Sequence, residues 1–306
     1  MAADPSVEER GQEPGVGRGI ACIIAAVFLL SICDAMAKSL GHAGYQAFQI
    51  VFFRYLFGLL PVAVFVWRSG PGALRSRRPI AHALRACLMF GALATFFAGL
   101  RVLPLAEAIA VTFTAPLFVT ALSAPLLGEP VGPRRWAAVL VGFAGTLIVL
   151  RPGTEAFRPE SLLVLCSALC FALAMLLTRW MARTETNTAM LAYSTLGAGI
   201  ACLPFLGFVW RPLEAEHLWL FLALGILGGI GANFMISAYR HAPAAVIAPF
   251  DYTALIWGAL LGWFLFQDRP DHFVWLGAAI IVAAGLYITR RESALRRARN
   301  PLPGAT

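Results

Sequence analysis

The sequence contains an internal repeat at a constant offset of 139 residues, with no gap between the copies. Identical residues recur at this offset: Ala35-Met36 and Ala174-Met175, Arg101 and Arg240, Pro104 and Pro243, Thr114-Ala115 and Thr253-Ala254, Trp136 and Trp275, Arg151 and Arg290. Each copy carries five long apolar stretches. A chain that crosses a bilayer an odd number of times enters its second copy from the opposite side. The repeat therefore predicts two halves related by inversion in the membrane plane.

Composition also indicates a membrane protein. The chain is 59% hydrophobic and 13% charged, with a mean hydropathy of +0.76, against roughly 25% charged residues in soluble domains. Its apolar runs are 19–39, 45–67, 81–101, 104–127, 132–150, 160–180, 187–209, 217–239, 243–266 and 271–289. Each is close to the roughly 20 residues that a helix needs to cross a bilayer. We predict an all-α membrane protein with ten transmembrane helices, arranged as two inverted five-helix repeats.

This prediction divides the chain into four parts. They are an N-terminal tail at 1–17, a first repeat at 18–151, a second repeat at 157–290 and a basic C-terminal tail at 291–306. The first tail is polar and rich in acidic residues and glycine, so no cleavable signal peptide is expected and the first apolar run is a retained span.

Positive charge is distributed unequally between the two sides of the predicted membrane. With a cytoplasmic N-terminus, sixteen Arg residues fall in cytoplasmic segments and six Lys or Arg residues on the other side. The positive-inside rule then places both termini in the cytoplasm. The tail at 290–299 is expected to anchor this topology and to touch anionic lipid. Because no aromatic residue is interleaved with these arginines, the net charge of +8 is not interpreted as nucleic-acid binding.

Neither a metal site, a cofactor nor a catalytic group is expected. All six cysteines lie inside or at the edge of predicted spans, and no His or carboxylate adjoins Cys166 and Cys170 at metal spacing. The five histidines lie near span ends without a second ligand at useful spacing. Lys38 is the only lysine, and the residues before it lack the glycines of a phosphate-binding loop. ATP-driven pumping by this chain is therefore excluded.

Polar residues within the spans carry the functional information, because each is costly in a bilayer and usually faces a cavity or a partner. Candidate substrate-binding residues are Asp34, Lys38, Arg54, Glu107, Asn233, Asp251, Tyr252 and Trp257. Structural alternatives exist for several of them. Asp34 and Lys38 have the spacing of an intrahelical ion pair, Lys38 has the length to snorkel outward, and Arg54 has acidic candidates to neutralise. Core packing is the alternative for the two aromatic residues.

Prolines interrupt corresponding spans of the two copies. Pro104 and Pro116 lie in the fourth span, and Pro243 and Pro249 in the ninth. Since proline removes a backbone donor and frees a carbonyl one turn earlier, interrupted helices at matching positions indicate a central binding site with hinges. A tightly packed kink is the alternative. Gly142, Gly145, Gly277 and Gly285 permit close helix contact, in a scaffold or in a homodimer interface.

Several segments resemble the drug/metabolite transporter superfamily, in its bacterial ten-helix branch with two EamA domains. They are Pro104-Leu-Ala-Glu-Ala-Ile-Ala, Ala115-Pro116-Leu-Phe, Leu127-Gly128-Glu129, and Trp136 followed by Gly142-Phe-Ala-Gly145, with second-copy counterparts at Pro243, Phe266-Gln267-Asp268 and Trp275. The resemblance covers about residues 18 to 290 and implies an inner-membrane carrier. It places a central cavity among spans one, three, four, six, eight and nine. Gln267-Asp268 departs from the Gly-Glu pattern, which leaves the geometry of that loop open.

These observations favour a secondary active transporter that moves a small polar metabolite, such as an amino acid or a related compound, by alternating access. The segments Asp34-Ala-Met-Ala-Lys38 and Gln49-Ile-Val-Phe-Phe-Arg54 are similar to carriers assigned to amino acids, riboflavin or S-adenosylmethionine, so an uptake carrier for riboflavin or S-adenosylmethionine is the alternative. We expect Lys38 or Arg54 to contact an anionic group of the substrate. The energy is expected to come from a proton gradient or from the substrate gradient itself, and any proton coupling should act through Asp34, Glu107 or Asp251. A membrane-embedded lipid-modifying enzyme is the rival from another class, and a receptor or structural role is a further one.

Overall fold

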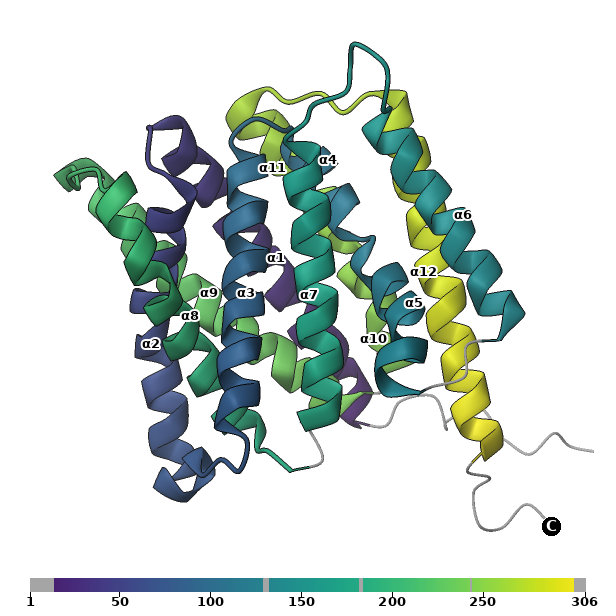
Figure 1. The fold of residues 1–306 in the computed structure, drawn as a ribbon, viewed down its shortest axis with the longest axis horizontal. Helices are drawn as coiled ribbons and strands as arrows, with labels where there is room; N and C mark the ends of the chain where they lie inside the picture. The colour runs from purple at the N-terminus through teal and green to yellow at the C-terminus, as the bar shows by residue number, and fades with distance from the viewer. Residues whose placement is uncertain (1–13, 129–131, 182–183, 243, 300–306) are drawn as a thin grey trace, which may run out of the picture.

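The computed structural model describes residues 14–128, 132–181, 184–242 and 244–299, and these residues form helices and their connections, with no strand among them. Figure 1 shows the helices as one bundle. Their bounds are α1 (Pro14–His42), α2 (Ala47–Ser69), the short 3₁₀ helix η3 (Pro71–Leu74), α3 (Pro79–Leu100), α4 (Leu105–Thr112), α5 (Ala115–Leu127), α6 (Pro133–Leu150), α7 (Ser161–Met181), α8 (Asn187–Val209), α9 (Ala215–His241), α10 (Ala244–Asp251), α11 (Thr253–Phe266) and α12 (His272–Arg299).

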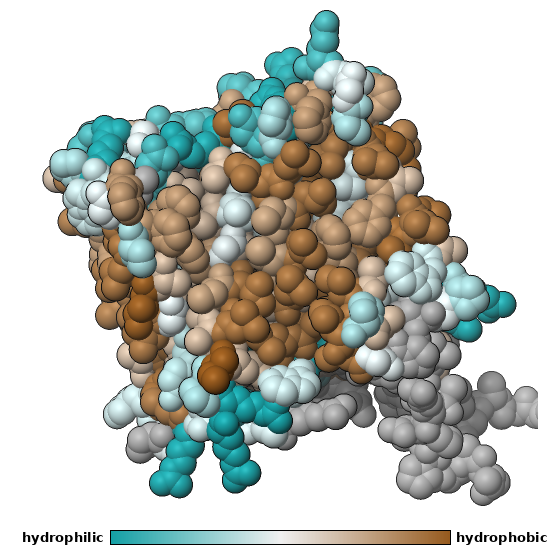
Figure 2. Space-filling model, viewed as in Figure 1, coloured by the Kyte–Doolittle hydropathy of each residue, from teal (hydrophilic) through white to brown (hydrophobic). Residues whose placement is uncertain are grey.

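Ten segments of the described chain are helical, long and apolar enough to cross a membrane. The fourth is divided between α4 and α5, and the ninth comprises α11 and the end of α10. Figure 2 shows a hydrophobic band around the middle of the molecule, with hydrophilic residues gathered above and below it. Large apolar side chains such as Phe208, Leu140 and Ile200 are 90%, 66% and 56% exposed. Such a continuous apolar surface is suited to lipid rather than water. The predicted all-α membrane fold with ten membrane-length helices is therefore confirmed.

The bundle has two ends, which differ in charge. We call the end at which α1 begins and α12 ends, and where η3 lies, the basic end; it is at the bottom of Figure 1. The opposite end, with the connections 43–46, 101–104, 151–160, 210–214 and 267–271, is called the distal end. Proline in the first turn starts α3 and α6 at the basic end, where its missing N–H costs no hydrogen bond.

The helix contacts follow a two-fold pattern. The first helix of each copy packs against the third helix of the other copy: α1 packs against α9, and α7 packs against α3. Two further contacts join equivalent elements of the two copies, α2 with α8 and α6 with α12, and α4 of the fourth span packs on α11 of the equivalent ninth span. Moreover, α1 and α7 begin at opposite ends of the bundle (Figure 1). This arrangement is compatible with two inverted repeats.

The two divided spans are interrupted at the same repeat position. The first breaks at Phe113 and Thr114, between α4 and α5, and the second at Tyr252, between α10 and α11. Pro104 precedes α4, Pro116 lies in the first turn of α5 and Pro249 lies inside α10. The second break occurs although Leu255 stands where the first copy has Pro116. Pro243 lies outside the described residues.

The departure of the second copy from the Gly-Glu pattern does not change the backbone. Gly128 ends α5 with φ of 66°, and Gln267 ends α11 with φ of 57°, so both adopt the left-handed conformation. Glycine accepts that conformation without steric cost. Gln267 adopts it with its backbone N–H donating to Trp263 O at 3.0 Å.

Small residues bring α6 and α12 together within one chain. A Cβ atom at Gly277 would lie 2.6 Å from Gly145 O, and a Cβ atom at Gly145 would lie 2.9 Å from Ile280. These two glycines thus make a helix–helix contact within one chain, as expected if α6 and α12 form a scaffold.

Candidate functional site

The candidate residues lie at three levels of the bundle. Lys38 and Glu107 are at the distal end. Asp34 and Arg54 lie about 12 and 10 Å from the distal ends of α1 and α2, and Asp251 with Tyr252 lies on the side of the basic end. Trp257 and Asn233 lie between these levels on α11 and α9. The three levels are described in turn.

Lys38 is engaged at the distal end. Its ammonium donates to Asp268 Oδ2 at 2.5 Å and to Leu103 O at 2.9 Å, and its side chain is 3% exposed. The same Asp268 oxygen accepts the Leu105 N–H at 3.0 Å. Lys38 on α1 is therefore joined to the loop that precedes α12 in the second half. Its ion-pair partner is Asp268, not Asp34 one turn away, so the intrahelical pair does not describe Lys38.

Further polar contacts close the distal end. Arg151 and Asp271 form an ion pair at 2.7 Å, which joins the end of α6 to the start of α12. Gln49 donates to Arg211 O at 2.7 Å and accepts the Arg211 N–H at 3.1 Å. Glu107, in the first turn of α4, belongs to this charged environment, since Arg158, Arg151 and Asp271 are among the charges acting on it. The distal end is thus held by charges and amides between the two halves.

Arg54 lies inside the bundle without a carboxylate partner. Its guanidinium stands over the Phe97 ring at 5.9 Å and would be 3.1 Å from a Cβ atom at Gly228, so the guanidinium packs closely on the backbone of α9 there. It also interacts with the Cys33 thiol, and Asp34 is the acidic group whose charge it feels. Arg54 Nη1 is nevertheless buried and has no hydrogen-bond partner, and no ion pair involving Arg54 is found among the described residues. A buried unpaired donor of this kind is the expected signature of a ligand site.

Asp251 forms the second polar centre. Its Oδ2 accepts a hydrogen bond from the Tyr239 hydroxyl at 2.9 Å, whereas its Oδ1 is buried without a partner. Tyr239 comes from the last turns of α9, so the contact joins α9 to α10. No basic side chain forms an ion pair with Asp251 among the described residues. The free oxygen is an acceptor for a proton or for a cationic ligand group.

Aromatic side chains lie between these centres. Trp257 packs edge-on against Phe28 of α1 with ring centroids 4.8 Å apart, and its Nε1 is buried without an acceptor. These two rings form part of an apolar pocket of about 390 Å³ between α1 and α11. Tyr252 contacts Phe113 with ring centroids 4.7 Å apart. Asn233, on α9, is half-buried.

Several site residues were missed by sequence reasoning. Tyr239 was not singled out, because a tyrosine at a span end resembles an interfacial anchor. Asp268 was noted only as the acidic counterpart of Glu129, and its pairing with Lys38 spans 230 residues. No local spacing predicts such a contact.

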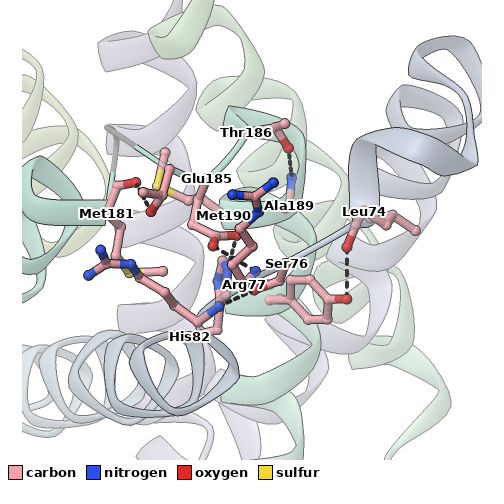
Figure 3. A network of polar contacts seen from close by, with 12 residues as sticks. Leu74, Ser76, Arg77, His82, Met181, Glu185, Thr186, Ala189 and Met190 are labelled. Carbon is pink, nitrogen blue, oxygen red and sulfur yellow. Dashed lines mark hydrogen bonds and ion pairs between the residues drawn. The ribbon is translucent and has the colours of Figure 1, made fainter.

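A polar network at the basic end was also missed. Glu185 accepts from Arg77 N at 2.9 Å and pairs with His82 Nε2 at 3.1 Å (Figure 3). Burial alone would raise the pKa of Glu185, but these hydrogen bonds hold the pKa below its usual value of 4.5. Arg85 donates to Thr178 Oγ1 at 2.7 Å and to Met190 O at 2.8 Å. The network joins α3 of the first half to α7 and α8 of the second.

Comparison with known proteins identifies relatives of this architecture. The model of the EamA-like transporter family matches residues 17–151 and 158–290. A protein of Rickettsia prowazekii named S-adenosylmethionine uptake transporter is 32% identical over 274 residues, which is 90% of this chain and 93% of the relative. A riboflavin transporter of Rhizobium johnstonii is 36% identical over 255 residues, covering 82% of each chain. A pseudopaline exporter of Pseudomonas aeruginosa is 25% identical, covering 90% of this chain and 96% of the relative.

A solved crystal structure supports the fold. It matches with a TM-score of 0.62 at 22% identity and covers 91% of this chain and 99% of its own. The ten membrane-length helices, the two matched segments and the transporter relatives together describe a multi-pass bacterial membrane protein. The chain belongs to the EamA-like transporter family.

Proposed function

We propose that this transporter is a secondary carrier for S-adenosylmethionine, with riboflavin as the second candidate. The observation that carries the proposal is Arg54, whose buried Nη1 has no partner in the protein. A guanidinium that is inside the membrane and not neutralised by an ion pair is expensive unless a ligand completes its environment. An anionic group of the substrate supplies that partner, and a carboxylate fits a guanidinium in the bidentate geometry that arginine favours.

The other groups of the site suit the rest of this substrate. S-adenosylmethionine carries an ammonium and a sulfonium as well as its carboxylate. Asp34 and Asp251 are intramembrane carboxylates for which no ion pair is found among the described residues, although Arg54 acts on Asp34, and each is suited to one of these cations. Trp257 and Phe28 supply aromatic faces for a planar base. A set of one cation, two anions and aromatic rings complements a molecule with two cationic groups, one carboxylate and a planar ring.

Riboflavin is the second candidate because a riboflavin transporter is 36% identical to this chain. Its isoalloxazine ring also fits aromatic side chains, but it offers no carboxylate for Arg54. The two candidates make different demands on that residue. If riboflavin is the substrate, an uncharged replacement of Arg54 affects flux far less than it does for S-adenosylmethionine.

Alternating access between the repeats at 18–151 and 157–290 is the mechanism that we propose. With the distal end held by Lys38–Asp268 and Arg151–Asp271, opening toward that end requires these ion pairs to separate. Lys38 is thus assigned to this closure rather than to the substrate. We place both termini in the cytoplasm of a bacterial inner membrane. A C-terminal reporter that is active only in the periplasm must then stay inactive.

The proposal is tested by flux in proteoliposomes. Labelled S-adenosylmethionine should exchange against unlabelled S-adenosylmethionine and be recovered chemically unchanged, whereas a lipid-modifying enzyme would release a new product. Arg54→Ala should lower the initial rate by about tenfold to a hundredfold, since hydrogen bonds to charged groups contribute about 1.5–3 kcal/mol. Arg134→Ala, which removes an exposed arginine at the basic end, is the matched control. Equal rates for both variants would reject the assignment of Arg54.

A further inference from the structure

A second pocket lies apart from the candidate transport site, on the surface between α3 and α8 at the basic end. It has a volume of about 330 Å³. Ala83 and Ala86 line it from α3, and Leu196, Gly197 and Ile200 line it from α8. The two helices touch at its floor, where a Cβ atom at Gly197 would lie 2.7 Å from Ala86 Cβ. The floor is therefore closed toward the interior of the bundle.

The mouth of this pocket faces the bilayer. Leu196 and Ile200 on its wall are 47% and 56% exposed, and Ile80 and Leu84 on the adjoining face of α3 are 84% and 53% exposed. Side chains of this kind at this level of a membrane protein are surrounded by acyl chains. The groove is thus apolar and open toward the side. The contact between α3 and α8 at Gly197 sets its width.

The end of the groove nearest to water is polar and basic. Ser76 and His82 line it, and the segment 68–78 that passes over it contains Arg68, Arg75, Arg77 and Arg78 but no acidic residue. Arg75 and Arg77 are exposed, whereas Arg78 stacks on Trp180 at 3.7 Å. Two exposed arginines therefore flank Ser76, which lines the groove.

Glu185, the carboxylate that contacts this segment among the described residues, is already satisfied. Glu185 Oε1 accepts the Arg77 N–H, and Glu185 Oε2 pairs with His82 Nε2 (Figure 3). These bonds hold the arginine segment against the groove and engage both oxygens of the carboxylate. His82, 4% exposed, keeps a buried Nδ1 that has no partner in the protein. A polar group is left to be satisfied at the same place where positive charge is in excess.

We propose that this groove is a binding site for an anionic phospholipid, whose headgroup phosphate is held by the arginine segment and whose acyl chain lies between α3 and α8. Basic residues at the cytoplasmic rim of membrane helices attract anionic headgroups, and an apolar groove of this kind accommodates a hydrocarbon chain. A zwitterionic phospholipid meets the apolar demand but leaves the arginine charges unbalanced. A lipid at this place bridges α3 of the first repeat and α8 of the second.

Purified full-length protein in mild detergent tests the proposal by its thermal unfolding midpoint. Soluble short-chain phosphatidylglycerol should raise the midpoint, because a ligand that binds only the folded state stabilises it. Short-chain phosphatidylcholine and free glycerol phosphate should give a much smaller rise. Equal stabilisation by phosphatidylcholine would show that the site does not select for the net charge of the headgroup. Equal stabilisation by glycerol phosphate would show a phosphate site rather than a lipid site. Either result overturns the proposal.

Two variants locate the effect. Ala83→Phe fills the groove from an exposed position, and the double variant Arg75→Ala with Arg77→Ala removes the headgroup charges. Both should lose most of the shift caused by phosphatidylglycerol. The matched controls are Ala137→Phe on the exposed face of α6, and Arg18→Ala with Arg134→Ala, which remove equal charge elsewhere at the basic end. A shift that survives in the groove variants, or that is lost equally in the controls, would reject this site.

Discussion

Phe113 and Tyr252 occupy equivalent positions of the two repeats and lie against each other, with ring centroids 4.7 Å apart and ring planes inclined at 41°. Each marks the point at which its span is interrupted, between α4 and α5 and between α10 and α11. The two interruptions therefore meet where the halves of the protein meet. Any movement of one repeat against the other must turn about this aromatic contact or slide across it.

The space behind Tyr252 gives the first prediction. A methyl group at Gly285 would overlap the Tyr252 hydroxyl, so Gly285→Ala should destabilise the folded protein by about 1–3 kcal/mol, as overpacking does. Tyr252→Phe removes that oxygen and should restore most of the loss in the double variant. Thermal unfolding in detergent measures both effects. Gly207→Ala, at a position with open space around it, is the control and should not lower the midpoint. Failure of Tyr252→Phe to rescue would contradict this packing.

The Lys38–Asp268 pair gives the second prediction. Lys38→Met and Asp268→Asn should each lower the free energy of unfolding, because each leaves one buried charge without its partner. The double variant should be less destabilised than the sum of the two, with a coupling of about 0.5–3 kcal/mol. A double-mutant cycle of unfolding measures this coupling. If Lys38→Met abolished flux at unchanged stability instead, Lys38 would act on the substrate.

The architecture could be predicted because it follows from one-dimensional properties of the chain. Apolar runs of bilayer length predict the number of spans, and an odd number in each copy predicts inversion. Pro116 identified the fourth span as an interrupted one, although the break falls at Phe113 and Thr114. Pro249 likewise identified the ninth span as an interrupted one, and the break falls three residues later, at Tyr252, although Leu255 stands at the position that matches Pro116.

The site could be predicted only in part. The free-energy cost of placing a charged side chain in the membrane singles out Asp34, Arg54 and Asp251 as unusual. It does not tell which polar residues are neutralised by distant segments of the chain. Lys38 seemed equivalent to Arg54 in sequence, yet only Lys38 meets a carboxylate, 230 positions away. Tyr239 and Glu185 are ordinary residues in sequence and acquire their roles from neighbouring helices. Such pairings depend on three-dimensional contacts that no spacing encodes.

The Glu185 network gives a prediction about pH. Despite the opposing effect of burial, hydrogen bonds from His82 and Arg77 lower the pKa of Glu185 in the folded protein below 4.5. A carboxyl group with a depressed folded pKa contributes stability above its unfolded pKa and loses it as pH falls through the folded value. Glu185→Gln should therefore be less stable than the parent at neutral pH, and the difference should shrink below a pH of about 4.5.

Thermal unfolding of the two proteins across this range measures the difference. Glu155→Gln, in the exposed connection between α6 and α7, is the control and should follow the parent at every pH. A gap between the parent and Glu185→Gln that is independent of pH would mean that the carboxylate charge does not stabilise this end of the bundle.

Asp251 gives the last prediction, which concerns the coupling of transport to energy. Its Oδ2 is held by Tyr239, its Oδ1 is buried and free, and an unpaired charge at this depth costs on the order of 3 kcal/mol on insertion scales. We expect the carboxylate to be neutralised in the cycle by a proton or by a cationic group of the substrate. Asp251→Asn keeps the shape and removes the charge, so it should stop accumulation driven by a proton gradient.

Exchange without a gradient separates the two ways of neutralising Asp251. If a proton does so, Asp251→Asn should retain energy-independent exchange, since the neutral amide mimics the protonated carboxyl group. If the substrate cation does so, exchange should be lost as well. Tyr239→Phe is the matched variant, because it removes one donor and leaves the charge, and it should slow accumulation without abolishing it. Accumulation by Asp251→Asn at the parent rate, with the parent dependence on pH, would show that Asp251 is structural.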